Sequence, residues 1–342
     1  MLLTKTKSDL TRFSMYGRST FLAVFLAISS AFALTLASSL TPALAQAPVT
    51  LRDNPLRGII DFHVHSGPDS FTRSMSDVEI ARIARARGVG ALVLKNHFTM
   101  TADRAFLAER LTGQRCYGGV VLNRAVGGLN AEAIRRMVTF TGGRGKVVWL
   151  PTFDAENHVR RFKEDRPYVP VVKDGKPVAE LKEIFALVAQ HNLVLETGHS
   201  SADECLLLIR AARAAGVKHL LVTHAMADPI RMSIEQMKEA AGLGAKLECT
   251  WLTNLQGPAA HQASMRHWRH VSTADYAKAI RAVGVQHFVL SSDLGQYLNP
   301  IPTDGMKAFI LELREAGFSD KDISQMCRKT PAKLLGMEAA TR

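Results

Sequence analysis

Two histidines two residues apart, His63 and His65, end a short apolar run and have the spacing of a metal-binding pair. Alternate side chains of an extended chain point to the same side, so both imidazoles are expected to face one cavity. Neutral imidazole is a good ligand for zinc and for other divalent first-row metals. The pair alone is weak evidence, because polar residues also end strands for purely structural reasons.

Three later apolar runs end in residues of the same chemical kind, namely His199, His224 and Asp293. Four histidines and one carboxylate are sufficient ligands for one or two divalent ions, with a position left for water. We therefore predict a metal centre of one or two divalent ions, with Zn²⁺ as the metal that suits this ligand set best.

The elements that must position these residues are eight short β-branched or apolar runs, which alternate with stretches of helical periodicity. The predicted strands are 58–63, 90–95, 116–122, 146–150, 193–197, 219–223, 245–249 and 287–291. Parallel neighbours need a crossover connection, and about 250 residues in eight strand–helix units is the size of a closed barrel. We predict an α/β fold, a (β/α)₈ TIM barrel in a single domain. The alternative is an open doubly wound sheet, but the first predicted strand is not followed by a glycine-rich phosphate loop.

Two long insertions are expected, one after the fourth strand and one after the seventh. Residues 154–177 contain an Asp-Gly pair at Asp174 and Gly175, which predicts a small hairpin. Residues 251–270 are rich in aromatic, His and Arg side chains. Both insertions follow carboxyl ends of strands, the face on which barrels carry their active sites.

The chain resembles the amidohydrolase superfamily, whose pattern is His-x-His on strand 1, one His on each of strands 5 and 6, and an Asp on strand 8. The matching residues are His63, His65, His199, His224 and Asp293. Residues 326–336 are similar to the helix that often ends these enzymes, and the resemblance covers about residues 58–337. It implies a metal-dependent hydrolase, and occasionally a decarboxylase or isomerase. It also implies that Asp293 takes a proton from the attacking water and passes it to the leaving group.

One departure from that pattern concerns the ligand that bridges two metals. Many members carry a carboxylated Lys or a Glu on strand 4, and the run 146–150 has neither at its end. Lys95, at the end of the second predicted strand, is the candidate substitute, since a buried neutral amine can react with carbon dioxide to give a carbamate. Alternatively, Lys95 stays an ammonium that binds an acidic substrate, and His97 is then a candidate ligand. Further candidates beyond the fourth strand are Asp154, Glu156 and His158.

Substrate selection is expected from side chains in the loops. The candidates are Arg73, His97, Arg104 and Trp251. Arginine suits carboxylate and phosphate groups because its guanidinium can donate two parallel hydrogen bonds, so we predict a small anionic substrate.

These features predict a secreted metal-dependent hydrolase that uses activated water on a C–N or ester bond. Two further enzymatic hypotheses are a mononuclear metal-dependent decarboxylase or lyase and a phosphoesterase. A barrel that holds metal without turnover is a fourth hypothesis. The expected partner is a small molecule, and these barrels often form homo-oligomers. The sequence carries no motif of nucleic-acid binding.

The first 45 residues differ from the rest of the chain. Four basic residues precede an uncharged apolar stretch at 21–40, and an Ala-x-Ala pattern follows at 43–47. This arrangement predicts a Sec-type signal peptide at 1–45, cleaved after Ala45 or Ala47, and a mature domain at 46–342 that is secreted or periplasmic with no membrane anchor. The alternative is an uncleaved anchor, since twenty apolar residues could just span a bilayer.

Composition limits the remaining possibilities. Hydrophobic residues make up 47% of the chain and charged residues 22%, which excludes a disordered chain and a small disulfide scaffold. Loss of four basic residues and Asp9 with the leader lowers the formal net charge from +12 to +9. Without a basic run, we interpret this charge as a basic solvated surface. The four cysteines contain no CxxC pair, so buried free thiols are at least as compatible with the sequence as disulfides.

Overall fold

The computed structural model describes residues 54–337, so the predicted signal peptide and its cleavage site lie outside the described residues. In the described part, eight parallel strands form one sheet in the order β1-β2-β3-β4-β7-β8-β9-β10. The strands are Ile60–His65 (β1), Ala91–Lys95 (β2), Cys116–Val121 (β3), Gly145–Trp149 (β4), Val194–Glu196 (β7), His219–Val222 (β8), Lys246–Thr250 (β9) and Phe288–Ser291 (β10). Each predicted strand is present, with both ends within two residues of the predicted ones.

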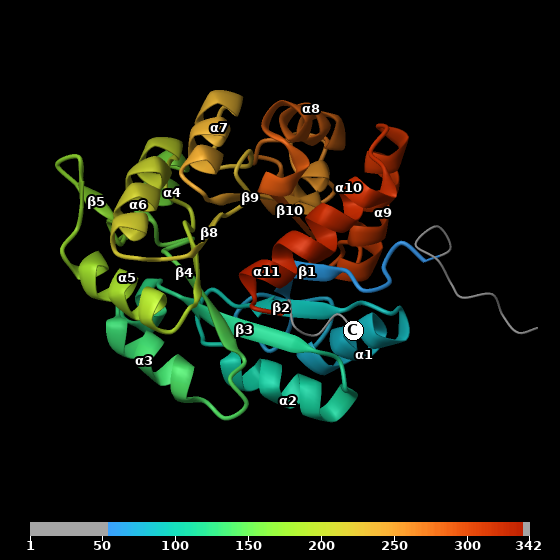
Figure 1. Cartoon of the computed structure of the whole chain (residues 1–342), viewed down its shortest axis with the longest axis horizontal. Helices are drawn as coiled ribbons and strands as arrows, with labels where there is room; N and C mark the ends of the chain where they lie inside the picture. Colours follow the sequence, from blue (N-terminus) through green and yellow to red (C-terminus); the bar gives the residue numbers. More distant parts are fainter. Residues whose placement is uncertain (1–53, 338–342) are drawn as a thin grey trace, which may run out of the picture. The chain divides into compact units, whose positions relative to one another are not determined.

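Helices cross over between successive strands and surround the sheet (Figure 1). They are Asp77–Ala86 (α1), Ala102–Thr112 (α2), Ala131–Thr139 (α3), Glu156–Arg161 (α4), Glu180–Gln190 (α5), Ala202–Ala214 (α6), Ile234–Gly242 (α7), Thr273–Val283 (α8), Pro302–Glu315 (α9), Asp320–Ser324 (α10) and Thr330–Leu334 (α11). Ser76, Ser201, Ser233 and Ser272 begin α1, α6, α7 and α8 with a reciprocal capping box, which satisfies two otherwise free backbone donors at each start. The predicted (β/α)₈ barrel is therefore confirmed.

The barrel closes between β1 and the residues that follow β10. The backbone N–H of Asp293 donates to the carbonyl of His63 at 2.9 Å, and the N–H of His65 donates to the carbonyl of Leu294 at 2.8 Å. Val64 and Leu294 form an isolated parallel bridge at the same place. Closure thus brings the first and last segments of the described chain together at the carboxyl ends of the strands.

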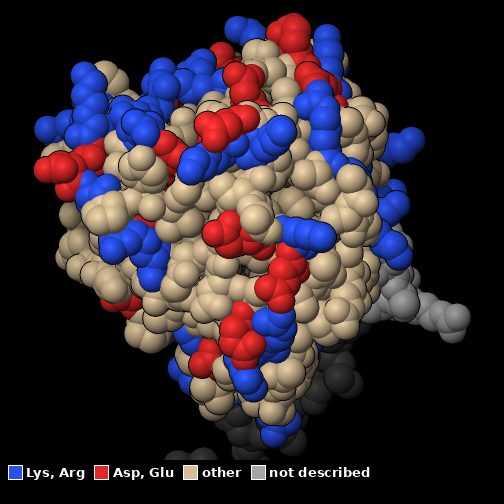
Figure 2. Space-filling view, turned by 90° about the vertical axis from the view of Figure 1, so that its left-hand side faces the viewer, with Lys and Arg blue, Asp and Glu red and all other residues tan. Residues whose placement is uncertain are grey.

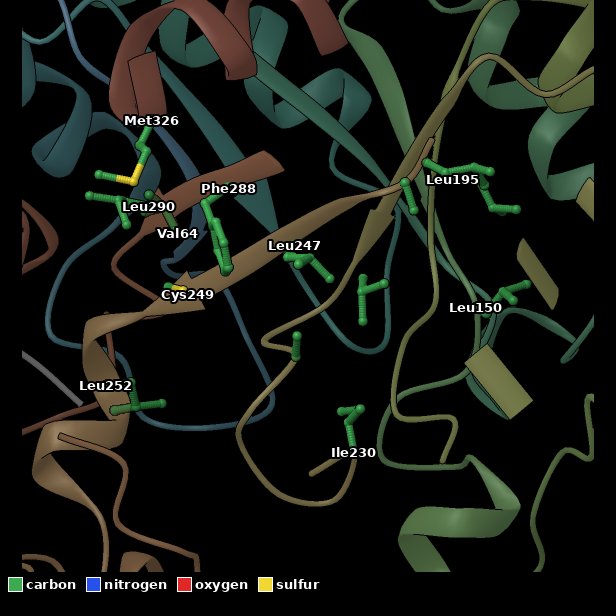
Figure 3. Packing of buried hydrophobic residues seen from close by; sticks show 14 of the residues in the cluster. Val64, Leu150, Leu195, Ile230, Leu247, Cys249, Leu252, Phe288, Leu290 and Met326 are labelled. Carbon is green, nitrogen blue, oxygen red and sulfur yellow. The ribbon is translucent and has the colours of Figure 1, made fainter. Parts of the chain in front are cut away.

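Side chains alternate between the inside of the barrel and the layer under the helices. Val147 and Trp149 of β4 belong to the inner apolar cluster, whereas Val148 belongs to the outer one. The outer layer around β9 and β10 includes Leu247 and Phe288 (Figure 3). Because every strand buries both faces, the strands have continuous apolar runs, which is the pattern that allowed their prediction.

An irregularity in β1 decides where its histidines point. The pairing of β1 with β2 shifts between Asp61 and Val64. Phe62 lies in the inner cluster and Val64 in the outer cluster, although they are two residues apart and would share a face in a regular strand. The shift therefore turns His63 and His65 to the inside, where strict alternation from Phe62 would have placed them outside.

The insertion after β4 contains α4 and the predicted hairpin. Its strands are Val172–Lys173 (β5) and Lys176–Pro177 (β6), paired antiparallel around Asp174 and Gly175. The insertion after β9 contains two 3₁₀ helices, Trp251–Leu255 and Ala263–Met265.

All four cysteines lie in the described part of the chain, and each is buried as a free thiol. Among residues 54–337, no helix combines the length and apolar character that a membrane crossing requires.

Basic and acidic side chains are intermixed on the face shown in Figure 2. Opposite charges also pair between neighbouring helices of the barrel, as Arg135 of α3 does with Glu183 of α5 and Arg210 of α6 with Glu239 of α7. This distribution agrees with the predicted solvated basic surface on that face.

The contact between β3 and β4 leaves no room for a side chain at Gly119. A Cβ added there would overlap the carbonyl oxygen of Val147 and the ring of Trp149. We expect Gly119→Ala to lower the free energy of unfolding by about 3 kcal/mol, because neither the backbone nor the buried indole can yield cheaply. Urea unfolding followed by circular dichroism measures this change.

Gly242→Ala is the matched control. An added Cβ at Gly242, at the end of α7, meets no atom within 4 Å, so a gain of about 0.5–1 kcal/mol is expected from helix propensity. Equal stability of the two variants would contradict the steric account of the β3–β4 contact.

Candidate metal centre

Three of the predicted ligands converge at the carboxyl ends of the strands. His63 Nε2 and His65 Nε2 lie 3.1 Å and 3.2 Å from the same oxygen, Asp293 Oδ1. All three residues are buried, and each offers a ligand atom within 4.8 Å of the other two. Within residues 54–337 this is the one group of three or more such residues that could hold a metal ion.

Asp293 is held in place by its backbone. It has a positive φ of 53°, an unusual conformation for a non-glycine residue that turns the chain sharply after β10. Its N–H donates to His63, as described above, and its carbonyl accepts from Gln296 Nε2 at 2.7 Å. The carboxylate is thereby directed at both imidazoles of β1.

His199 and His224 form a second group beside the first. They lie in the turns after β7 and β8, and their Nε2 atoms are 3.2 Å apart. The His224 ring stacks on that of His63 with 6.2 Å between centroids. The five histidine and aspartate residues predicted as ligands therefore lie in one cluster, divided into a group of three and a pair.

Charged groups inside the barrel support these ligands from below. Glu248 of β9 accepts from His63 Nδ1 at 3.2 Å and from the backbone N–H of His224 at 3.0 Å. Lys95 of β2 places its Nζ 3.0 Å from His63 Nε2. Glu196 of β7 accepts from Thr223 Oγ1 at 3.0 Å. Glu248 thus joins the two ligand groups through hydrogen bonds to one member of each.

Burial favours the neutral form of His65, His199 and His224. It lowers the pKa of His65 and of His199 well below the usual range, and it lowers the pKa of His224 to about 3, with the nearby Lys95 adding to that effect. Neutral imidazoles present a lone pair, which is the form that binds a metal ion.

The pKa values of the two buried glutamates shift in opposite directions. Burial raises the pKa of each, but the charge interaction and hydrogen bond with His63, together with the N–H of His224, hold the pKa of Glu248 at about 2. For Glu196, burial and the neighbouring charge of Glu248 leave the pKa well above its usual range. These shifts favour the charged form of Glu248 and the protonated form of Glu196.

The donor set fits a divalent ion. Zinc–ligand distances of about 2.0–2.1 Å in a tetrahedron place neighbouring ligand atoms about 3.3 Å apart. The separations from Asp293 Oδ1 to the two β1 imidazoles, and between the Nε2 atoms of His199 and His224, are 3.1–3.2 Å. These contacts bring together neutral nitrogen and carboxylate oxygen, the ligand types that zinc prefers.

A cavity of about 520 Å³ opens above the ligands. Its lining includes His158 and Glu164 from the insertion after β4, and Leu252, Met265 and Trp268 from the insertion after β9. Both insertions therefore contribute walls to the cavity, as their positions in the sequence suggested.

The four residues predicted to contact substrate divide into two groups. Arg73 and His97 line the cavity, and Arg73 is fixed by an ion pair of 2.7 Å with Asp69. Arg104 and Trp251 are not among the residues that line it.

An ion pair holds Arg104, and a hydrogen bond holds Trp251, outside the cavity lining. Arg104 pairs with Asp77 of α1 at 2.7 Å, and Trp251 donates through Nε1 to Glu312 of α9 at 3.2 Å. Both side chains thus join neighbouring elements of the barrel and do not line the cavity.

His97 lies beside the ligands. Its ring stacks on that of His65 with 4.9 Å between centroids, and its Nδ1 is 2.9 Å from Thr152 Oγ1. His158 of α4 is closer to the pair, with its Nδ1 2.9 Å from His199 Nδ1. The other two candidates after β4 take part in ion pairs at the surface, Asp154 with Arg166 and Glu156 with Arg160.

Residues 58–248 match the model of a family of unknown function, DUF6282. The chain belongs to this family. The matched range includes His63, His65, Lys95, His199 and His224 but ends before Asp293. Comparison of this DUF6282 member with curated proteins gave no match.

Solved structures with the same fold include an organophosphorus hydrolase from Deinococcus radiodurans, at 16% identity and a TM-score of 0.54, covering 83% of this chain and 93% of that one. A lactonase template engineered for organophosphate hydrolysis has 17% identity and a TM-score of 0.54, covering 83% and 97%. The phosphotriesterase homology protein from Escherichia coli, complexed with phosphate, has 16% identity and a TM-score of 0.54, covering 81% and 98%. At these identities the similarity establishes the barrel fold of the DUF6282 chain.

Glu248 was not among the residues that the sequence predicted for the site. Its signal was present, since Glu248 is a charged residue inside the apolar run 245–249. Leu247 and Cys249 belong to the outer apolar cluster, so Glu248 must point into the barrel. Its partner His63 could not be found in the same way, because that contact depends on the closed barrel.

We expect Glu248→Leu to weaken zinc binding at His63, His65 and Asp293 by about 10–100-fold, because a carboxylate that orients a ligand imidazole contributes this much to metal affinity. Glu248→Gln retains an acceptor oxygen and should lose less. Chelator competition at fixed pH measures both affinities. If both variants bound zinc as tightly as the unaltered protein, Glu248 would have no orienting role.

Proposed function

We propose that the protein is a metal-dependent hydrolase that cleaves a C–N or ester bond of a small anionic substrate. The observation that carries the proposal is the cluster of His63, His65 and Asp293, which lies at the carboxyl ends of the strands and on the floor of a cavity of about 520 Å³. This is the face of a (β/α)₈ barrel on which catalytic residues are found. The fold relatives named for organophosphate hydrolysis and for a lactonase are consistent with it.

A divalent ion held by His63, His65 and Asp293 would supply hydroxide at neutral pH and polarise the scissile carbonyl. Asp293 lines the cavity, where its carboxylate can take a proton from the attacking water and deliver it to the leaving nitrogen or oxygen. Arg73, held against the cavity by Asp69, can receive the anionic group of the substrate.

Lys95 is the proposed bridging group, as a carbamate. Its amine would add to the carbon of carbon dioxide and release one proton to water, which leaves a carboxylate on Nζ. Two features support the proposal: Lys95 is buried, and its Nζ lies 3.0 Å from His63 Nε2 at the edge of the ligand cluster. The alternative is an uncarboxylated Lys95 that holds an acidic substrate.

A mononuclear decarboxylase or lyase is the second candidate. The observation that favours it is that residues 54–337 supply one group of three metal ligands, whereas His199 and His224 stand as a pair. One ion at the group of three would suffice for polarising a carboxylated substrate.

We also propose that the chain is exported, on the strength of the leader-like pattern at residues 1–45. Mass spectrometry of protein recovered from the producing cells gives the mature N-terminus. A mature N-terminus at residue 46 or 48 is expected, and an intact leader would contradict a cleaved signal peptide and favour the uncleaved anchor.

Asp293→Asn should lower turnover by about 10²–10⁴-fold, because an amide cannot accept the proton in transit. A screen of amide, ester, lactone and phosphotriester substrates first identifies a substrate that the unaltered protein hydrolyses. The kcat for that substrate is then measured for the unaltered protein and for Asp293→Asn. Asp103→Asn, which neutralises an exposed carboxylate of α2, is the control and should leave kcat unchanged. Near-normal turnover by a folded Asp293→Asn protein would remove the proposed role.

Metal content separates the two candidate reactions. Hydrolysis with a Lys95 carbamate predicts close to two ions per chain when bicarbonate is supplied, and a loss of the second ion in Lys95→Ala. The lyase hypothesis predicts close to one ion per chain, with no effect of bicarbonate. Elemental analysis of the dialysed protein decides between them, and less than a tenth of an ion per chain would contradict both.

A further inference from the structure

His158 of α4 is a buried histidine that the proposed mechanism does not use. It is 1% exposed and is surrounded by three aromatic side chains. The centroid distances from its ring are 5.1 Å to Phe153, 4.7 Å to Phe162 and 5.7 Å to Trp268. These contacts fix the plane of the imidazole, so the directions of its two nitrogens are set by packing.

Its Nδ1 is aimed at a residue of the ligand pair. His158 Nδ1 and His199 Nδ1 are 2.9 Å apart, and the two rings stack at an interplanar angle of 19° with 4.9 Å between centroids. A hydrogen bond between two imidazole nitrogens requires a single proton, carried by one ring and accepted by the other.

The opposite side of His199 decides which ring carries that proton. His199 Nε2 lies 3.2 Å from His224 Nε2, at the cavity. If Nε2 of His199 is to present a lone pair there, its proton must sit on Nδ1 and be donated to His158. His158 then accepts through Nδ1 and carries its own proton on Nε2, which faces Glu164 Oε1 at 3.7 Å.

We propose that His158 is a positioning residue that accepts the Nδ1 proton of His199 and so keeps Nε2 of His199 free to bind a second metal ion with His224. This inference rests on the proposed function, since it assumes that the site binds metal. It differs from direct ligation by His158, because His199 stands between His158 and His224. Among the described residues, no group of three ligands includes His158.

The insertion after β4 therefore supplies a hydrogen-bond acceptor as well as a cavity wall. Asn157, the neighbour of His158 on α4, donates through Nδ2 to the carbonyl of His199 at 3.0 Å and to that of Pro229 at 3.2 Å. These bonds tie α4 to the turns after β7 and β8. The position of the acceptor is thus fixed relative to both members of the ligand pair.

Cobalt titration of the metal-free protein tests the proposal. Co²⁺ is added to the unaltered protein, His158→Phe and His158→Asn, and visible absorption is followed with a competing chelator present. His158→Phe fills the aromatic surroundings without an acceptor and should weaken the second ion by about 10–100-fold, with the first ion unaffected. His158→Asn places a carbonyl oxygen near the position of Nδ1 and should recover most of that affinity.

His191→Phe is the matched control, because it makes the same substitution at an exposed histidine at the end of α5 that does not line the cavity. It should bind the second ion as the unaltered protein does. If His158→Phe does not fold, His158→Gln replaces it in the experiment. The carbonyl oxygen of Gln lies near the position of Nε2, so it cannot accept the proton of His199. The affinity for the second ion is then compared between His158→Asn and His158→Gln.

Two results would overturn the proposal. One is a second ion that binds equally well with or without an acceptor at position 158, and the other is an unaltered protein that binds a single ion. The second result leaves a mononuclear enzyme at His63, His65 and Asp293 intact. Conversely, the protein could bind cobalt as expected and yet turn over none of the screened substrates. That result would contradict the proposed hydrolase function and still support the positioning role of His158.

Discussion

Closure of the barrel is the constraint on which the site depends. The N–H of Asp293 donates to His63, and the N–H of His65 donates to Leu294, so residues separated by more than two hundred positions share two backbone hydrogen bonds. These bonds are directional and lie in a buried region, where an unpaired backbone group would be costly. They fix the Asp293 carboxylate against both β1 imidazoles. A packing contact between side chains could not set that position so narrowly.

A second constraint is the cost of burying charge inside a barrel. Lys95, Glu196 and Glu248 are nearly inaccessible to solvent, and an isolated charge in that position would be strongly destabilising. The structure offsets this cost by hydrogen bonds between the polar groups and by protonation of Glu196. Below them the barrel is filled by apolar side chains such as Val147 and Val194. The interior is thus divided into a packed lower layer and a polar upper layer that supports the ligands.

The sequence allowed the strands and the cluster of His and Asp side chains at their ends to be predicted for the same reason. Strands buried on both faces have continuous apolar runs, and a His or Asp that ends such a run lies at the carboxyl edge of the sheet. The direction of the His63 and His65 side chains was predicted correctly, but the prediction assumed a regular strand. The irregularity between Asp61 and Val64, which turns both side chains inward, leaves no mark in composition or periodicity.

The loop residues were less predictable, because their roles depend on what packs against them. An Arg after a strand has the same sequence signature whether it faces a cavity, as Arg73 does, or pairs with a helix, as Arg104 does with Asp77. Trp251 was likewise predicted to contact the substrate, but its indole N–H donates to Glu312. Sequence position placed these residues on the correct end of the barrel, and only the tertiary contacts distinguish their roles.

The two insertions meet at His199, and this meeting has a consequence for how the site is assembled. His158 comes from the segment after β4 and Trp268 from the segment after β9, yet both rings lie within 6.4 Å of the His199 ring, measured between centroids. The strands alone bring His199 beside His224, but the aromatic side chains of the insertions fix the plane of the His158 ring. Because a metal ligand must present its lone pair in a defined direction, the insertions constrain the ligand pair as well as the shape of the cavity. A change in either insertion that alters the substrate pocket is therefore expected to act on the ligand pair too, which couples substrate specificity to metal binding in this barrel.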